Sequence, residues 1–407
     1  MVLGIIAEYN PFHNGHLYHF LKSKELTKDD YCIAIIGGNF TQRGEPSLID
    51  KWTKAEMALA NGVDLVIELP TLYATSSAEN FAEGAIKILS SLKIVDNLSF
   101  GAESNNLNKL NLIANTLYKE PKEYKNILQN ELAKGLSFPK ARENALIQFL
   151  NDNSYSLILN EPNNILAIEY LKALKKYKSN INPVSIVRKK AGHLTNDYTG
   201  QITSASAIRN MIRTNKTRNL KITLTPPSYT ILSEEMNKGH FVSSIYAFEK
   251  TIIYNLRTMR LEDIRNLPDV SEGLENIIKK AASSCNSIDE FINIASSKRY
   301  TETRLKRILL YSLLNITKKD IQVSKKTMPY IRVLGFNNNG KKLLSDITKS
   351  NPGLEIITSV KKFMNSNKNK NLQTILEKDL YATDIYTLGY NKDSWANLDY
   401  TKKIIIK

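Results

Sequence analysis

The feature that most constrains the fold of this chain is a regular alternation of short apolar runs and helical patterns over its first 110 residues. The apolar runs are apolar on both faces, which is typical of parallel strands covered by helices. We expect strands at 2–7, 31–36, 64–69 and 97–100, and helices at 16–24, 53–61 and 78–92. This order predicts a doubly wound parallel α/β sheet, which binds ligands beyond the carboxyl ends of its strands.

The rest of the chain is mostly helical in pattern, over 107–180 and 228–318, with further strands expected at 182–188 and 328–336. A length of 407 residues predicts two or three domains. The pair Pro226-Pro227 indicates a boundary, because paired prolines end helices and stiffen linkers. We therefore expect an α/β domain over residues 1–225 and a second, mainly helical basic domain over residues 226–407.

Positive charge is concentrated in the second half. The chain has a formal net charge of +16, and counting its charged residues gives +1 for residues 1–200 and +15 for residues 201–407. A basic half beside a neutral half indicates a module that binds a polyanion such as nucleic acid. The alternative is a lysine-rich solvated surface that has no partner.

Targeting and metal-binding patterns are not evident in the sequence. The N-terminus lacks the pattern of a signal peptide, and no apolar run approaches the roughly 20 residues of a bilayer span. Cys32 and Cys285 form neither a CxxC pair nor a Cys/His cluster, which argues against a disulfide framework and a structural zinc site. We expect a cytoplasmic protein with no membrane contact and no metal site of its own.

Three of the five histidines, at positions 13, 16 and 19, follow the first expected strand. Pro11 favours a turn there, and Gly15 lets a phosphate approach the backbone of the helix that follows. His13 and His16 are three residues apart and can stabilise an α-phosphate as it becomes pentavalent. The alternatives are a chance pair of surface histidines, or two metal ligands without an evident third. The motif reads Asn10-Pro11-Phe12-His13-Asn14-Gly15-His16.

This motif resembles the HxGH signature of the HIGH-motif nucleotidyltransferase superfamily. Residues 202–209, Ile-Thr-Ser-Ala-Ser-Ala-Ile-Arg, loosely resemble its second signature, of KMSKS or ISSTxxR type. The lysine of KMSKS is absent, so Arg209 would bind the β- and γ-phosphates, while Ser204 or Ser206 caps the next helix. The alternative is an ordinary N-capped helix with a surface arginine.

The resemblance extends over the whole chain to the bacterial tRNA(Met) cytidine acetate ligases, through residues 7–16, 38–46, 51–52, 61–70, 162–166, 303–307 and 334–335. It implies that ATP activates acetate to acetyl-adenylate, with Mg²⁺ able to accompany the ATP. The acetyl group then passes to N4 of the wobble cytidine of elongator tRNA(Met).

The resemblance also implies site residues. His13, His16 and Arg209 would be catalytic. The residues expected to bind ATP, including the two serines of the second motif, are Ile6, Ala7, Glu8, Tyr9, Asn10, Pro11, Phe12, His13, Asn14, Gly15, His16, Leu17, Tyr18, His19, Gly101, Asn163, Arg188, Ser204 and Ser206.

The residues themselves support three of these positions. Gly101 follows an expected strand, where a backbone passes close to a ligand. Asn163 starts a helix, where it can instead be a plain N-cap, and Asn164 is an alternative for its role. Arg188 ends a strand at the sheet edge, and its alternative is a surface charge.

For tRNA we expect contacts in the basic half. Arg304 and Arg307 lie three apart on an expected helix whose apolar stripe is Leu305, Ile308 and Leu309, so both can face one phosphate track. Tyr300 lies nearby and can stack on a base. The alternative is a solvated basic helix face. The full set is Lys298, Arg299, Arg304, Arg307, Lys341 and Lys342.

Two other functions remain open from the sequence. One is a small-molecule adenylyltransferase, but such catalytic domains are far shorter and leave the basic half unexplained. The other is a catalytically inactive RNA-binding protein on the same fold, against which intact His13, Gly15, His16 and Arg209 argue.

Overall fold

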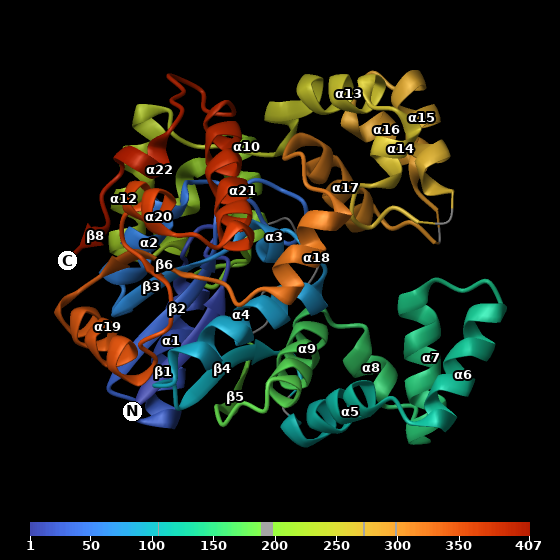
Figure 1. Ribbon diagram of the computed structural model, residues 1–407, viewed down its shortest axis with the longest axis horizontal. Coiled ribbons are helices and arrows are strands. Elements are labelled where there is room, and N and C mark those ends of the chain that lie inside the picture. Colours follow the sequence, from blue (N-terminus) through green and yellow to red (C-terminus); the bar gives the residue numbers. More distant parts are fainter. Residues whose placement is uncertain (105, 189–197, 272, 298) are drawn as a thin grey trace.

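A computed structural model describes residues 1–104, 106–188, 198–271, 273–297 and 299–407 (Figure 1). Within these residues a central sheet has eight strands in the order β5-β4-β1-β2-β3-β6-β7, with β8 paired to β6. The strands from β5 to β3 run parallel, whereas β6 is antiparallel to β3. Their bounds are β1 Val2–Ala7, β2 Tyr31–Gly37, β3 Leu65–Leu69, β4 Asn97–Ala102, β5 Asn182–Val187, β6 Ile331–Phe336, β7 Ile356–Ile357 and β8 Ile405–Ile406.

Helices cover both faces of this sheet, because its strands are apolar on both sides. Leu3 and Ile5 of β1 share a core with α1 (Asn14–Thr27), α2 (Lys51–Ala60), α10 (Ala205–Arg213) and α12 (Pro226–Lys238). Val2 and Ile6 belong to the opposite core, with α4 (Ala78–Leu92), α9 (Pro162–Lys176) and α19 (Asn338–Ser350). The doubly wound α/β fold expected from the sequence is confirmed.

The strand order places the carboxyl end of β1 at a crossover point. The chain runs from β1 outward through β2 and β3, and then returns to place β4 on the other side of β1. Ligands of open α/β sheets bind where the strand order reverses in this way. The segment after β1, which carries the three histidines, therefore lies where a nucleotide is expected.

Two helical parts extend from the sheet (Figure 1). One holds α5 (Leu107–Lys119), α6 (Lys122–Ala133), α7 (Phe138–Leu150) and α8 (Tyr155–Leu159). The other, which we call the helical unit, spans residues 245–326 and packs around buried residues such as Ile252, Leu274 and Ile288. Its helices are α13 (Glu249–Thr258), α14 (Leu261–Arg265), α15 (Leu274–Ser284), α16 (Ile288–Ala295), α17 (Glu302–Leu313) and α18 (Lys318–Lys326).

The chain returns to the sheet after the helical unit. β6 pairs with β3, and α20 (Val360–Ser366), α21 (Lys370–Thr387) and α22 (Leu398–Thr401) follow. The remaining short helices are α3 (Thr71–Ala74) and α11 (Leu220–Thr223). In the described part of the chain, no helix combines the length and apolar character needed to cross a bilayer.

The region around the expected domain boundary is continuous with the first core. Pro226 is the first residue of α12, capped by Thr225, because proline is favoured in the first helical turn. Leu232 of α12 packs in the same core as Ile208. β6, which follows residue 225, pairs with β3, which precedes it, so strands from both sides of the expected boundary belong to one sheet. The part that extends away from this sheet is the helical unit. The assignment of ATP to residues 1–225 and of tRNA to residues 226–407 stays a prediction.

Candidate functional site

The first motif forms a tight connection between β1 and α1. Tyr9 and Phe12 are buried, with ring centroids 4.7 Å apart, and anchor the connection in the core. His13, which is also buried, is the N-cap of α1. The Asn14 amide donates hydrogen bonds to the carbonyl oxygens of Gln201 (3.1 Å), which directly precedes the second motif, and of Ile222 (2.8 Å) in α11.

Backbone contacts fix the tautomers of His13 and His16. The backbone N–H of Gly15 donates to Nδ1 of His13 (3.0 Å), and that of His13 donates to Nδ1 of His16 (3.3 Å). A neutral imidazole that accepts at Nδ1 carries its proton at Nε2. Both rings therefore present an Nε2–H donor, which is what a developing negative charge on a phosphate requires.

The two imidazoles lie against each other and against Gly15. Their centroids are 3.8 Å apart with planes inclined by 27°. A Cβ atom at position 15 would lie 2.8 Å from Cε1 of His13. Glycine at this position therefore leaves room for the stacked pair.

All three histidines are held neutral. Burial, together with the positive charge of Arg188, lowers the pKa of His13 to about 3 and that of His19 to about 4. Burial also lowers the pKa of His16, as do the neighbouring His13 ring and the charge of Arg188. His19 lies within 3.1 Å of Ser99 Oγ on β4 through its Nε2 atom, which connects α1 to the neighbouring strand.

These pKa shifts predict a stability that falls on acidification. In the unfolded chain a histidine titrates near 6.5, so between pH 6.5 and about 3 the unfolded state binds a proton that His13 of the folded state does not. His13 thus adds a slope of at most about 1.4 kcal/mol per pH unit in this window. We expect His13→Asn to flatten the pH dependence of the free energy of unfolding, measured by urea denaturation. Identical pH profiles for both proteins would contradict this reading.

Arg209 joins the two motifs. Ser204 is the N-cap of α10 and accepts from the backbone N–H of Ala207 (3.1 Å). One turn later, the Arg209 guanidinium donates to the carbonyl oxygen of Asn10 (2.9 Å) and to Ser206 Oγ (3.4 Å). A guanidinium has five N–H donors, so these two contacts leave others for phosphate.

Arg188, Asn163 and Gly101 also lie together, at the carboxyl ends of β4 and β5. The Arg188 guanidinium donates to Asn163 Oδ1 (3.1 Å), and a Cβ at Gly101 would lie 3.2 Å from Arg188 Cγ. Asn164 has a structural role instead: it is buried, and its Oδ1 accepts from the backbone N–H groups of Glu103 and Ser104, both at 2.9 Å. This arrangement favours Asn163 over Asn164 as the ATP contact.

The other expected ATP contacts differ in whether their side chain or only their backbone can face a nucleotide. The side chains of Ile6, Tyr9 and Phe12 are in the core, so only their backbone can face a nucleotide. Glu8 accepts from the backbone N–H of Gln42 (2.9 Å). Of the remaining members, Ala7 ends β1, Pro11 lies in the connection, and Leu17 and Tyr18 lie in the first turns of α1.

The expected tRNA contacts that the structure describes do not form one patch. Arg304 donates to the carbonyl oxygen of Asp269 and to Ser271 Oγ, and Arg307 forms an ion pair with the Asp269 carboxylate at 2.7 Å. Tyr300 is buried beneath Arg304, with 5.2 Å between the guanidinium carbon and the ring centroid, so the expectation that it stacks on a base is wrong.

The remaining tRNA candidates lie apart from α17. Lys341 and Lys342 are exposed on α19, on the opposite side of the molecule from α17 (Figure 1). Arg299 is exposed before α17, and Lys298 lies outside the described residues.

Sequence reasoning missed the groups that hold the loop after β2. The buried Lys54 ammonium donates to the carbonyl oxygens of Gly37 and Gly38 (2.7 and 2.5 Å) and to Ser47 Oγ (3.0 Å). It also missed Glu103, whose carboxylate accepts from the Asn163 amide and from the backbone N–H of Asn164. The only signal for Glu103 was its place directly after β4.

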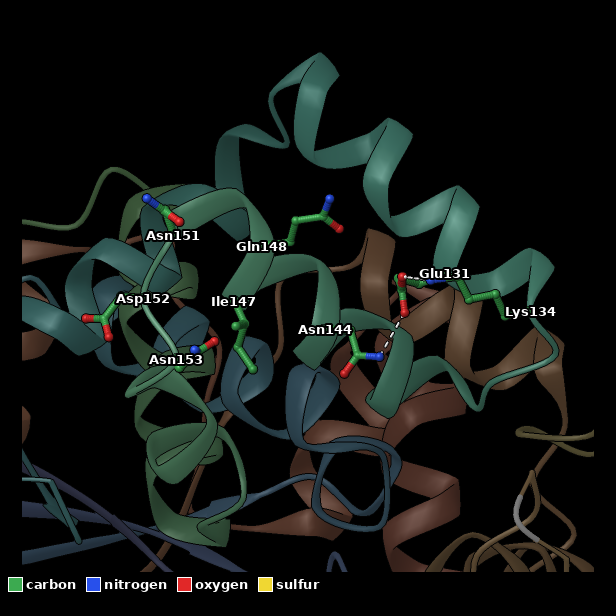
Figure 2. Close-up of a pocket in the computed structure, with 8 residues that line it drawn as sticks. All are labelled: Glu131, Lys134, Asn144, Ile147, Gln148, Asn151, Asp152 and Asn153. Atoms are coloured by element: carbon green, nitrogen blue, oxygen red, sulfur yellow. Dashed lines mark hydrogen bonds and ion pairs between the residues drawn. The ribbon is translucent and has the colours of Figure 1, made fainter.

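A separate hollow of about 460 Å³ lies between α6 and α7 (Figure 2). It is polar, and the Asn144 amide there donates to Glu131 at 2.8 Å. None of the residues expected to bind ATP or tRNA lines it. Its lining residues are Glu131, Lys134, Asn144, Ile147, Gln148, Asn151, Asp152 and Asn153.

Within the described ranges, no three His, Cys, Asp or Glu side chains gather into a group that could hold a metal ion. The His13 and His16 pair instead has both Nδ1 atoms committed to backbone N–H groups.

A doubly wound sheet with a stacked His-x-x-His pair at its crossover point defines a nucleotidyltransferase of the HIGH-motif class. A model of that family, described as HIGH Nucleotidyl Transferase, matches residues 1–399. Proteins named tRNA(Met) cytidine acetate ligase are similar over nearly the full length. One from Thermoanaerobacter sp. (strain X514) is 48% identical, covering 99% of each chain, and one from Halothermothrix orenii is 43% identical, covering 96% of this chain and 95% of its own. The chain belongs to the tRNA(Met) cytidine acetate ligase family.

Solved structures agree with this assignment. An apo crystal structure of Thermotoga maritima TmcAL superposes with a TM-score of 0.96 at 35% identity, covering 100% of this chain and 99% of that one. A second, bound with alpha-thio ATP, has a TM-score of 0.93 at 34% identity with the same coverage.

Proposed function

We propose that this protein activates acetate with ATP and transfers the acetyl group to N4 of the wobble cytidine of elongator tRNA(Met). The observation that carries the proposal is the stacked His13–His16 pair, whose Nδ1 atoms are both held by backbone N–H groups. The full-length similarity to named tRNA(Met) cytidine acetate ligases supports the substrates. Because the acceptor is a tRNA, we expect the reaction to take place in the cytoplasm.

In the first step, an acetate oxygen attacks the α-phosphorus in line, and the bond from that phosphorus to the pyrophosphate oxygen breaks. Negative charge grows on the α-phosphate oxygens, where the Nε2–H groups of His13 and His16 donate hydrogen bonds. Arg209 and Arg188 neutralise the phosphate chain as pyrophosphate leaves. The residues need to position and stabilise, and no protein nucleophile takes part.

In the second step, the N4 amine of cytidine attacks the acetyl carbonyl carbon. The bond from that carbon to the AMP oxygen breaks, and N4 loses a proton. Mg²⁺ accompanying ATP would neutralise part of the negative charge of the phosphates.

Transfer of labelled acetate to tRNA tests this function. Purified protein, ATP and elongator tRNA(Met) transcript should yield labelled N4-acetylcytidine, whereas a transcript with uridine at the wobble position should not. Pyrophosphate release that depends on a small phosphorylated acceptor instead of acetate, with no label on tRNA, would favour the adenylyltransferase alternative. ATP-independent tRNA binding without any transfer would favour the inactive RNA-binding alternative.

The two site arginines should act on ATP rather than on tRNA. Hydrogen bonds to charged groups are worth about 1.5–3 kcal/mol, so Arg188→Ala and Arg209→Ala should each weaken ATP binding by about tenfold or more. Calorimetry with ATP and filter binding with tRNA separate the two effects. Arg213→Ala is the matched control, because Arg213 is one turn further along α10 and bonds Asn210 Oδ1 of its own helix. Unchanged ATP affinity in both variants would place the nucleotide elsewhere.

Binding of tRNA should depend on the basic helical unit. Replacing Arg299 and Arg304 together by Gln should reduce the log–log salt slope of tRNA affinity by roughly 0.7–0.9 for each phosphate that the variant no longer neutralises. Arg307 is a weaker candidate, because its side chain is only 11% exposed and paired with Asp269. Lys341→Gln with Lys342→Gln tests the opposite side of the molecule. A slope that stays the same in the first pair and falls in the second would move the tRNA site to α19.

A further inference from the structure

The turn that follows β2 brings a third arginine to the nucleotide site. The backbone N–H of Gly44 donates to the carbonyl oxygen of Thr41 (3.1 Å), and a bridge between Phe40 and Pro46 closes the loop. Arg43 lies at the tip of this turn, with an exposed side chain. The base of the loop is fixed by the buried Lys54, so the tip has a defined position.

This turn contacts the first motif on one side. The backbone N–H of Gln42, the residue before Arg43, donates to Glu8 Oε1 at 2.9 Å. Glu8 is the first residue after β1, in the segment that leads to His13. Arg43 therefore directly follows a residue that contacts the connection between β1 and α1.

On its other side the turn is pressed against α17. Glu45 Oε1 pairs with the Lys306 ammonium at 2.8 Å, and Glu45 Oε2 accepts from the backbone N–H of Ile245 (3.1 Å). Gly44 has a φ of +77°, and a Cβ there would lie 2.5 Å from the Lys306 carbonyl carbon. Only glycine fits both the backbone conformation and the close approach.

Arg43 lies within electrostatic range of Arg188 and Arg209. Desolvation lowers the pKa of Arg188 and of Arg209, and the positive charge of Arg43 lowers both further, partly offset at Arg209 by Glu8 and Glu45. In the part of the chain that the structure describes, no hydrogen bond or ion pair engages the Arg43 guanidinium. Three guanidinium groups within electrostatic range repel one another, and a polyphosphate removes that repulsion.

We infer that Arg43 binds the β- and γ-phosphates of ATP, and the pyrophosphate formed from them, on a turn positioned by α17 through Gly44 and Glu45. The inference rests on the proposed function, since it assigns a further contact to the same site. It also gives the helical unit a direct route to the adenylation site, because Lys306 holds the turn from which Arg43 extends.

Binding of ATP and of AMP, measured by calorimetry without acetate or tRNA, tests this assignment. Arg43→Ala should bind ATP at least about tenfold more weakly, and Arg43→Lys should recover part of that loss. AMP affinity should stay the same in both, because AMP lacks the β- and γ-phosphates. Arg260→Ala is the control, since Arg260 is the N-cap of α14 in the helical unit and pairs with Asp263 of that helix.

A separate variant tests whether Glu45 positions the turn that carries Arg43. Glu45→Gln removes the charge that holds Lys306 and should weaken ATP binding less than Arg43→Ala does, again without changing AMP affinity. Equal ATP affinity in wild type and Arg43→Ala would overturn the assignment while leaving the proposed function intact. A wild-type protein that binds no ATP would instead overturn the proposed function.

Discussion

Replacing His13 by Asn should lower the rate of adenylation by about 10²–10³-fold, because one preorganised donor to the α-phosphate is removed. Asparagine is a favoured N-cap and can still accept from the backbone N–H of Gly15, so α1 should start at the same residue. Its shorter amide does not reach the position of the imidazole Nε2 atom. His16→Ala should lose activity by a similar factor. The measurement is the single-turnover rate of pyrophosphate release at saturating ATP and acetate.

Comparing His13→Ala with His13→Asn separates the loss of the helix cap from the loss of the donor. His13→Ala removes both the cap and the donor, and losing the cap costs about 1 kcal/mol of stability. His13→Asn should therefore unfold at a higher denaturant concentration than His13→Ala while being as inactive. Near-wild-type pyrophosphate release in His13→Asn would show that the imidazole serves only as a helix cap.

Replacing Lys51 by Met should destabilise the protein by about 3–5 kcal/mol, because two buried carboxylates then share Arg332 as their remaining cation. The Lys51 ammonium pairs with Glu68 (3.0 Å) and Asp399 (2.7 Å), and all three side chains are at most 2% exposed. Arg332 pairs with both carboxylates, at 3.6 and 2.6 Å, and completes the cluster. Equilibrium urea denaturation gives the free energy of unfolding.

The surface pair Lys22 and Glu25 is the matched control for this effect. Lys22→Met removes one partner of an exposed pair on α1 and should change stability by less than about 1 kcal/mol. A similar loss in both variants would mean that the buried cluster contributes little beyond an ordinary surface pair.

Much of the sheet and of the catalytic motif could be predicted from local patterns. The run from Val2 to Ala7 is apolar throughout, and β1 has these bounds. Ser204 or Ser206 was expected to cap the helix that carries Arg209, and Ser204 does. His13 and His16 were expected on one side of a helical turn, and their rings stack. In each case the signal lies within a few neighbouring residues.

The rest depends on contacts between residues far apart in the sequence. Nothing around Ile331 indicates that β6 pairs antiparallel with β3, because a strand does not specify its partner. Arg307 looked like a surface charge until the fold brought Asp269 beside it. Arg43 gave no local signal, because its proximity to Arg188 and Arg209 arises only when β1, β2, β5 and α10 are assembled.

Acetate-dependent exchange of labelled pyrophosphate into ATP tests the central claim most directly. The reaction needs only the adenylation site, so it should proceed without tRNA in the wild-type protein and be lost in His13→Asn. Omitting acetate should abolish it, because no acetyl-adenylate can then form and return its AMP to pyrophosphate. Exchange that is independent of acetate, or exchange retained in His13→Asn, would contradict the account of this protein as an acetate-activating enzyme of the HIGH-motif class.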